Sequence, residues 1–379
     1  MAGTTSNYSY TYDPMGRLLT VTKDGTLVEE YQYGANGARI SETNALRGIA
    51  SRFMAYTEED HMYQAGDTAY QYDVDGFLMS KTKGAEKTEY AYSSRGELLQ
   101  VKLPDGRVIV YYHDPLGRRI AKAINGVITE KCLWQGLTRL LAVYDGSNNL
   151  LMRFNYADGR MPVSMTKGGS TYYLTYNQIG TLKVVSDASG NVVKKVDYDS
   201  FGNIINDTNP SFTIPFAFAG GLYDPDTGLV RFGFRDYDPD IGRWTAKDPI
   251  GFWSSDTDLY GYCANNPINF VDPSGLSALK KFFEGVKEGH QKIHKDIRDA
   301  AAKMSPEMRT LVGATVVLAG TVLVESGTAV VIIGAPTGLG NIVTIPVGVT
   351  MVFLGGETMY IGYEIWSAKP GDEGACSRD

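Results

Sequence analysis

An aromatic residue recurs at a nearly constant interval through the first 200 residues, and this period constrains the fold more than any other feature. Successive anchors are 20 to 22 residues apart, except for one interval of 39, and several are followed by Asp or Asn and then Gly. They fall at Tyr12, Tyr33, Tyr72, Tyr92, Tyr112, Trp134, Tyr156, Tyr176 and Tyr198. A fixed period of this length indicates structural units that stack on one another.

Each unit has the pattern of a β-hairpin. The segment 8–12 alternates aromatic and small polar residues, which sends its rings to one face of a strand. Asp13, Pro14 and Gly16 follow with the residue types of a tight turn, and 18–22 forms a second strand. One hairpin cannot bury its apolar face alone, so its neighbours must stack on it. We therefore predict a mainly β fold over 1–209, built as a long spiralling or curved sheet.

Composition narrows the partners and cofactors. A net charge of −7 argues against a nucleic-acid partner, which would favour a basic surface. Cys132, Cys263 and Cys376 have neither the spacing of a metal site nor that of a disulfide framework, so we expect no metal and no cofactor. The N-terminus lacks a basic start and an apolar stretch, which predicts export by another route or a signal on a longer parent chain.

The repeat stops near Pro210, and a dense series of turn motifs follows as far as Leu276. Most contain an aspartate before proline or glycine, and they come in a fixed order. They are Tyr223-Asp224-Pro225, Phe234-Arg235-Asp236-Tyr237-Asp238-Pro239, Gly242-Arg243-Trp244, Asp248-Pro249-Ile250-Gly251, Asn266-Pro267 and Asp272-Pro273-Ser274-Gly275-Leu276. We treat 210–276 as a second domain.

Residues 277–379 form a third zone without the repeat. The segment 277–304 has apolar residues at helical spacing and an excess of basic residues, which predicts an amphipathic helix lying on a membrane or packed on a soluble core. His290 and His294 are four residues apart, but no further ligand motif accompanies them, so we interpret them as a solvated or half-buried pair.

The rest of the tail is strongly apolar. Between residues 311 and 363 the only charged residues are Glu325 and Glu357. A bilayer span needs about 20 apolar residues, and the stretch divides into two such spans, 311–333 and 342–365. We predict a hydrophobic α-helical hairpin over about 306–366, with Glu325 as a candidate membrane-insertion residue. The alternative is that this stretch forms the buried core of a soluble enzyme.

The repeat motifs resemble those of Rhs proteins, teneurins and the C subunits of insecticidal toxin complexes, which share a tyrosine–aspartate (YD) repeat. The 210–276 motifs resemble the Rhs core-associated domain. The resemblance implies a hollow cocoon around a C-terminal toxin segment, whereas periodicity alone equally allows a solid β-solenoid. It also implies self-cleavage between Leu276 and Ser277, with Asp236, Asp248 and Arg235 as the catalytic residues.

Two carboxylates are suited to this chemistry. If they lie close together they share a proton, so that one activates a water and the other polarises the scissile carbonyl, while Arg235 orients a carboxylate or stabilises the oxyanion. The competing interpretation is that both aspartates are ordinary turn residues. We interpret Asp224, Asp238, Asp240 and Asp272 as turn residues, and Arg243 as a structural partner of a shell carboxylate.

Together these features predict an antibacterial effector that is secreted or delivered into target cells, for example by a type VI-like system. Its autoproteolytic activity would act on itself and release a pore-forming tail to the target inner membrane. The implied partners are the target-cell membrane, a cognate immunity protein and a secretion spike, adaptor or chaperone. The alternatives are a soluble enzymatic toxin (a nuclease or nucleotide-modifying enzyme) in the same shell, and a non-toxic structural surface protein.

Overall fold

The computed structural model describes residues 6–157, 159–251 and 258–276, and the backbone of three short segments of the tail. The chain divides into two compact units, Met1–Lys280 and Lys281–Asp379.

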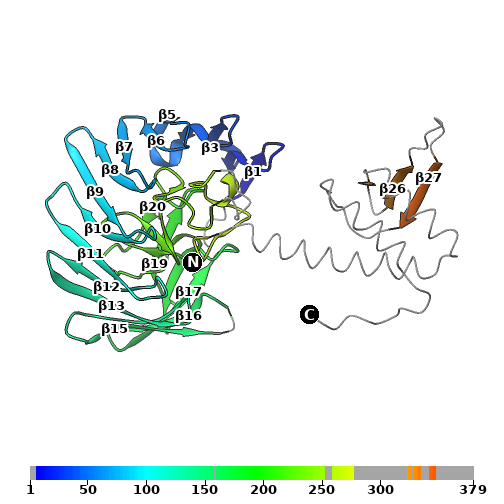
Figure 1. The fold of residues 1–379 in the computed structure, drawn as a ribbon. Coiled ribbons are helices and arrows are strands. Elements are labelled where there is room, and N and C mark those ends of the chain that lie inside the picture. The colour runs from blue at the N-terminus through cyan, green and yellow to red at the C-terminus, as the bar shows by residue number, and fades with distance from the viewer. Residues whose placement is uncertain are drawn as a thin grey trace, which may run out of the picture. The chain divides into compact units, whose positions relative to one another are not determined.

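The repeat region forms one 20-stranded antiparallel sheet in which every strand pairs with the next along the chain. The strands fan out as a curved wall, from blue β1 to green β20 in Figure 1. The first ten are β1 (Tyr8–Tyr12), β2 (Leu18–Lys23), β3 (Thr26–Tyr33), β4 (Arg39–Asn44), β5 (Ile49–Tyr56), β6 (Met62–Ala65), β7 (Thr68–Tyr72), β8 (Leu78–Lys83), β9 (Glu86–Tyr92) and β10 (Leu98–Lys102). The others are β11 (Val108–His113), β12 (Arg119–Ile124), β13 (Val127–Gln135), β14 (Arg139–Tyr144), β15 (Leu150–Tyr156), β16 (Pro162–Lys167), β17 (Ser170–Tyr176), β18 (Leu182–Asp187), β19 (Val192–Tyr198) and β20 (Ile204–Asp207). The predicted mainly β fold with a wall of repeated hairpins is confirmed.

The turn of each unit follows from its Asp-x-x-Gly sequence. The Asp13 carboxylate accepts hydrogen bonds from the backbone N–H groups of Met15 and Arg17, both at 2.9 Å. Gly16 takes a φ of 81°, which glycine adopts at little cost. The same bonds recur at Asp73, Asp114, Asp187 and Asp199. The turn chemistry therefore fixes the strand register at these five turns.

Several of the aromatic anchors act through hydrogen bonds as well as through burial. The hydroxyl of Tyr33 donates to the carbonyl of Leu18 at 2.6 Å, and that of Tyr156 donates to the carbonyl of Leu140 at 2.8 Å. Tyr56 makes the equivalent bond to Arg39, so it is the anchor that the 39-residue interval concealed.

One predicted anchor was assigned one residue too early. In the repeat of Tyr92, that anchor faces Leu98, the first residue of the following strand. In the next repeat the residue at the equivalent place is His113, which faces Arg119. The anchor is therefore His113, while Tyr112 is exposed. The aromatic period alone could not show this because three adjacent aromatic residues, Tyr111, Tyr112 and His113, precede Asp114.

The described part of residues 210–276 contains a small four-stranded sheet and the 3-10 turns η2 and η4. The elements are η2 (Phe218–Gly220), β21 (Leu222–Tyr223), β22 (Val230–Phe232), β23 (Arg235–Asp238), β24 (Arg243–Trp244) and η4 (Cys263–Asn265); a further 3-10 turn, η1 (Ala45–Arg47), lies in the repeat sheet. Phe232, Tyr237, Trp244 and Tyr262 form a buried aromatic core, in which Trp244 meets each of the other three rings edge to face. This core gives the cleavage-motif residues a rigid base.

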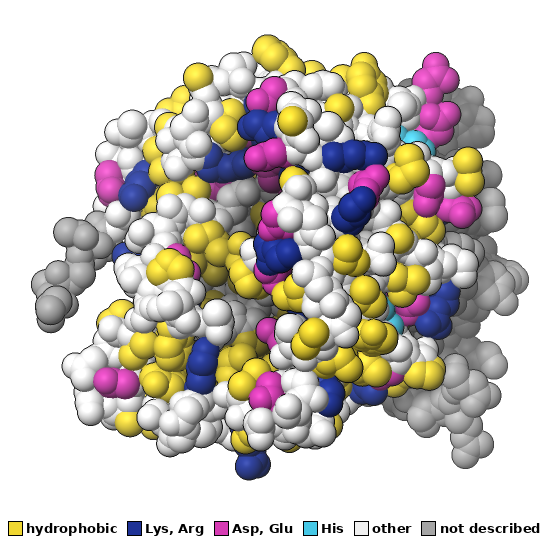
Figure 2. Space-filling view, turned by 90° about the vertical axis from the view of Figure 1, so that its left-hand side faces the viewer, with side chains coloured by type: hydrophobic (Ala, Val, Ile, Leu, Met, Phe, Trp, Pro, Cys, Tyr) yellow, Lys and Arg dark blue, Asp and Glu magenta, His cyan; other side chains and the backbone are white. Residues whose placement is uncertain are grey.

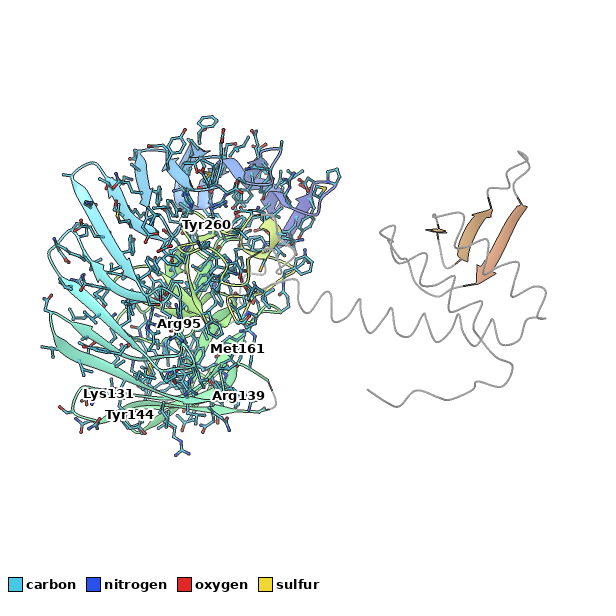
Figure 3. All side chains as sticks on the ribbon, in the orientation of Figure 1. Arg95, Lys131, Arg139, Tyr144, Met161 and Tyr260 are labelled. Atoms are coloured by element: carbon cyan, nitrogen blue, oxygen red, sulfur yellow. The ribbon has the colours of Figure 1, made fainter. Side chains whose placement is uncertain are left out.

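The small sheet is bound to the repeat wall by partly or fully buried polar contacts. Asp240 pairs with Arg47, Arg52 and Lys81, which come from three different parts of the wall. Tyr260 donates to the carbonyl of Gly76 at 2.6 Å (Figure 3). Across the face shown in Figure 2, hydrophobic side chains are interspersed with acidic and basic ones rather than gathered in one patch.

In the second unit, the described backbone forms β25 (Val322–Glu325), β26 (Thr328–Ile333) and β27 (Asn341–Pro346), an antiparallel sheet with Val322 opposite Val331 and Ala329 opposite Ile345. The prediction of helical spans over these segments is therefore wrong. Val, Ile and Thr dominate them, and β-branched side chains favour strands over helices. Among the described residues, no helix is long and apolar enough to cross a membrane. The predicted helix over 277–304 lies outside the described residues.

Candidate self-cleavage site

Strand β23 sends Arg235 and Asp236 to opposite faces, as successive residues of a strand do. Arg235 extends toward the loop 272–276, and Asp236 toward the repeat strand β12. Both side chains are buried, at 3% and 2% exposed. The two neighbouring residues of the motif therefore belong to two different polar networks.

Arg235 brings the second aspartate and the end of the motif region together. Its Nη2 nitrogen lies 2.8 Å from the Asp248 carboxylate and 3.4 Å from that of Asp272. Its Nε donates to the carbonyl of Gly275, and its guanidinium lies 4.2 Å from the centre of the Trp244 ring. Two buried carboxylates and a backbone carbonyl thus meet at one cation, one residue before Leu276.

The loop 272–276 lies directly against the turn between β22 and β23. The N–H of Phe234 donates to the carbonyl of Ser274 at 2.8 Å. A side chain on Gly233 would overlap that carbonyl, and one on Gly275 would overlap the carbonyl of Phe232. Glycine is required at both positions because backbone meets backbone, which explains the glycine of the Asp-Pro-x-Gly-Leu motif.

Asp236 is held by two arginines. One carboxylate oxygen accepts from Arg119 at 2.9 Å, and the other from Arg231 at 2.7 Å. Burial opposes ionisation of Asp236, but the two guanidinium groups outweigh it and hold its pKa below the usual range. We expected Asp236 and Asp248 to share a proton. The structure pairs Asp236 with two arginines, which favours its ionised form.

His113 belongs to the Asp236 network, and sequence analysis missed it. Neither of its ring nitrogens has a hydrogen-bond partner among the described residues. Burial, reinforced by Arg231 and Arg119, lowers the pKa of His113 to about 4. Its position as a histidine in a series of tyrosine anchors was the signal that could have revealed it.

The other aspartates of 210–276 are more than turn residues. Asp224 pairs with Lys122 at 2.7 Å and accepts from the hydroxyl of Tyr111 at 2.6 Å. Arg243 is a structural partner of a carboxylate, as predicted, but the carboxylate is Asp258 of the same domain, bound through both nitrogens at 2.6 and 2.8 Å. The Lys122–Asp224 pair joins residues more than 100 positions apart, so a local sequence motif could not predict it.

The structure does not describe the side chains of two predicted site residues, Ser277 and Glu325. Ser277 lies outside the described residues. The backbone of Glu325 ends strand β25 and faces Thr328 across the turn to β26.

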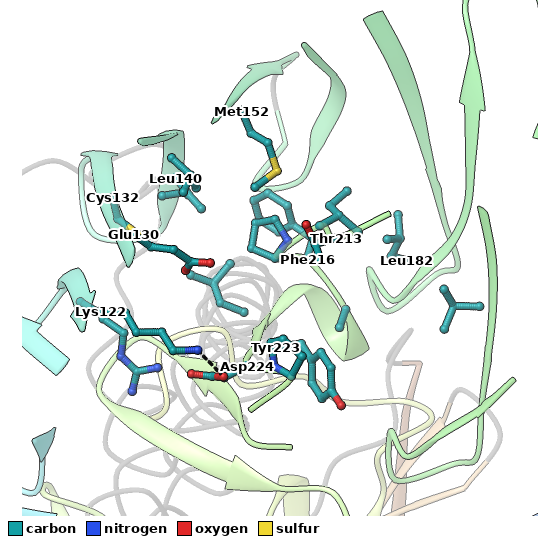
Figure 4. A pocket seen from close by; sticks show the side chains of 18 of the residues that line it. Lys122, Glu130, Cys132, Leu140, Met152, Leu182, Thr213, Phe216, Tyr223 and Asp224 are labelled. Carbon is teal, nitrogen blue, oxygen red and sulfur yellow. Dashed lines mark hydrogen bonds and ion pairs between the residues drawn. The ribbon is translucent and has the colours of Figure 1, made fainter. Parts of the chain in front are cut away.

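A cavity of about 400 Å³ opens between the repeat wall and residues 210–225. Apolar side chains such as Leu140, Met152 and Phe216 line one part, and Lys122, Glu130 and Asp224 line another (Figure 4). Burial, followed by the Glu130 carboxylate, raises the pKa of the neighbouring Cys132 to about 12, so this thiol is not a ready nucleophile. The volume suits a small molecule or a short run of side chains.

Comparison with known proteins identifies the repeat. Residues 1–268 match a family model described as the teneurin YD-shell. The chain is 34% identical over 278 residues to Teneurin-3 of Danio rerio and 33% identical over 279 residues to Teneurin-4 of Homo sapiens. Each match covers 70% of this chain and 10% of the teneurin, so the chain spans about a tenth of the length of these relatives.

A bacterial relative and a solved structure also match. The double-stranded DNA deaminase toxin A of Burkholderia cenocepacia (strain H111) is 29% identical over 303 residues, which covers 71% of this chain and 21% of that protein. The crystal structure of TcdB2-TccC3-TEV matches with a TM-score of 0.40 at 19% identity, covering 72% of this chain and 18% of that one.

Proposed function

Because this chain belongs to the teneurin YD-shell family, we propose that it is an Rhs-type toxin carrier that cuts its own backbone between Leu276 and Ser277. In this proposal 1–209 is the shell, 210–276 is the autoproteolytic domain and 277–379 is the payload. One observation carries the proposal: Arg235 joins the Asp248 carboxylate to the Gly275 carbonyl, next to the residue that precedes the cut.

The reaction is a hydrolysis. A water adds to the carbonyl carbon of Leu276, the bond to the Ser277 nitrogen breaks, and that nitrogen takes up a proton. The products are the Leu276 carboxylate and the Ser277 amine. We assign to Asp248 the transfer of the proton from water to the leaving amine, and to Arg235 the stabilisation of charge on oxygen.

Asp236 has a different task in this scheme. Its ionised form, supported by the lowered pKa, keeps Arg119 and Arg231 in position behind β23, the strand that carries Arg235 on its opposite face. It is therefore the permanently ionised member of the aspartate pair, while Asp248 changes protonation during the reaction.

The cleavage proposal is tested with the full chain and two variants, Asp248→Asn and Asp236→Asn. We expect the wild-type chain to give a new N-terminus at Ser277 by mass spectrometry, and both variants to remain whole on a denaturing gel. Asp187→Asn is the matched control, since Asp187 makes the same turn bonds on the exposed rim of the shell. Cutting of folded Asp248→Asn at the wild-type rate would show that the assignment is wrong.

For the payload we propose depolarisation of the target inner membrane. The support is the composition of 311–363, which has only two charged residues. The second candidate is an enzymatic toxin, favoured by the similarity to a DNA deaminase toxin. For either payload activity we propose delivery by a secretion system, with a spike or adaptor as partner. We also propose an immunity protein in the producing cell.

The two payload activities are separated by expressing the whole chain and its Asp248→Asn variant in bacterial cells. Membrane potential and DNA base damage are followed in parallel. Loss of potential with intact DNA supports the pore, and Glu325→Gln should then alter the rate of depolarisation. DNA damage before any loss of potential supports the enzyme, and harmless cleavage products would exclude both.

A further inference from the structure

The two ends of one peptide group are held next to the proposed cleavage bond. The carbonyl of Gly275 accepts a hydrogen bond from Arg235 Nε, and the N–H of Leu276 donates to Asp272 Oδ1 at 3.2 Å. These two backbone atoms belong to the same planar peptide unit. The plane that precedes the scissile bond is therefore fixed at both edges.

Asp272 is the residue that connects these restraints. Its Oδ1 also accepts from the hydroxyl of Ser274 at 3.0 Å, and its Oδ2 lies 3.4 Å from Arg235 Nη2. The side chain is buried, with the residue 1% exposed. Asp272, Arg235 and the Gly275–Leu276 peptide group thus form a closed loop of contacts, and Arg235 extends it to Asp248.

We infer that Asp272 is a positioning residue for self-cleavage, fixing the Gly275–Leu276 peptide group so that the Leu276 carbonyl is presented beside Asp248 and Arg235. This inference rests on the proposed function. Positioning matters because a displacement of about 1 Å in a reacting group can lower a rate by roughly 100-fold.

An ordinary turn aspartate does not explain the arrangement. Asp187 makes its turn with two backbone N–H groups, and its remaining oxygen accepts from the amide of Asn191 on the surface. A turn of this kind needs an acceptor but no buried charge. At Asp272 a carboxylate is buried against a guanidinium, and the cost of burying its charge is offset only because the arginine, the Ser274 hydroxyl and the Leu276 N–H all contact it.

The test compares three variants of the full chain: Asp272→Asn, Asp272→Ala and the control Asp187→Asn. Asn keeps an acceptor for the Leu276 N–H but removes the charge that binds Arg235, whereas Ala removes both. We expect self-cleavage during cell-free synthesis to slow about 10-fold for Asn and about 100-fold for Ala, with no change for the control. The thermal midpoint of each shell establishes that it is folded.

A second readout does not depend on cleavage. In an Asp248→Asn background, hydrogen exchange at the Leu276 amide should become faster with Asp272→Ala and stay unchanged with Asp187→Asn. Folded Asp272→Asn cut at the wild-type rate would overturn the positioning inference and leave the proposed function intact. An uncut wild-type chain would remove the proposed function itself, and the positioning inference with it.

Discussion

Glu29 of β3 and Ser200, in the turn that follows β19, are in contact although 171 residues separate them. The N–H of Ser200 donates to both carboxylate oxygens of Glu29, at 3.3 Å each. The hydroxyl of Tyr31 donates to the same carboxylate at 2.6 Å, and the Tyr31 ring meets Phe201 edge to face. The beginning and the end of the repeat sheet are therefore joined at a seam around a buried acid.

This seam predicts one component of the pH dependence of stability. Burial and the Asp199 carboxylate raise the pKa of Glu29 from 4.5 to about 7. The folded protein thus holds this proton more tightly than the unfolded chain, so the contribution is complete below pH 4.5 and is lost as the pH rises through 7. Glu29→Gln should remove the loss and stabilise the shell at pH 8 by about 2 kcal/mol, with little gain at pH 4.5. Thermal unfolding at the two pH values measures the difference; an equal gain at both would contradict the prediction.

His113 predicts a component of opposite sign. Because burial and two arginines lower its pKa to about 4, it stays neutral in the folded protein while the unfolded chain titrates near 6.5. Its contribution is present above pH 6.5 and is lost as the pH falls toward 4. His113→Phe keeps an apolar ring at this anchor and should reduce the loss of stability between pH 6.5 and 5.

The control for His113 is His61, which is less enclosed and stacks on Tyr72. His61→Phe should leave most of the acid sensitivity in place. Urea unfolding at pH 5, 6 and 7 provides the comparison. If both variants have the same acid slope as the wild-type chain, the environment of His113 does not control it.

How far the sequence predicts this fold depends on the range of each interaction. The strands, the Asp-x-x-Gly turns and most anchors follow from local patterns, because each hairpin fixes its own register. The glycine of the loop 272–276 could also be predicted from its local motif, Asp-Pro-x-Gly-Leu. Tyr56 was not identified as an anchor because its unit departs from the regular spacing. His113 was not identified because Tyr112, which directly precedes it, fits the aromatic period.

The candidate site depends on contacts that no local pattern encodes. Sequence analysis expected Arg235 to orient a carboxylate or stabilise the oxyanion without saying which carboxylate, and the alternation of β23 turns it to Asp248 and Asp272. The arginines that bind Asp236 come from β12 and β22, and Arg119 lies 117 residues away in the sequence. In the tail, apolar composition predicted burial, but it did not distinguish helix from strand at 322–346, where β-branched residues favour the strand.

The close approach of the loop 272–276 to β23 makes Gly275 the sharpest test of the site. A β-carbon at Gly275 would lie 2.9 Å from the backbone nitrogen of Arg235 and would overlap the Phe232 carbonyl. The φ of 67° is itself unfavourable for alanine. Gly275→Ala should therefore push the loop away from β23 and slow self-cleavage by about 100-fold or more. Gly190→Ala is the matched control, because Gly190 has a φ of 83° but open space around its α-carbon. The two variants share the conformational strain, so a cleavage defect in Gly275→Ala alone assigns the effect to docking of the loop. Equal cleavage in both, in shells of equal stability, would mean that this docking does not limit the reaction.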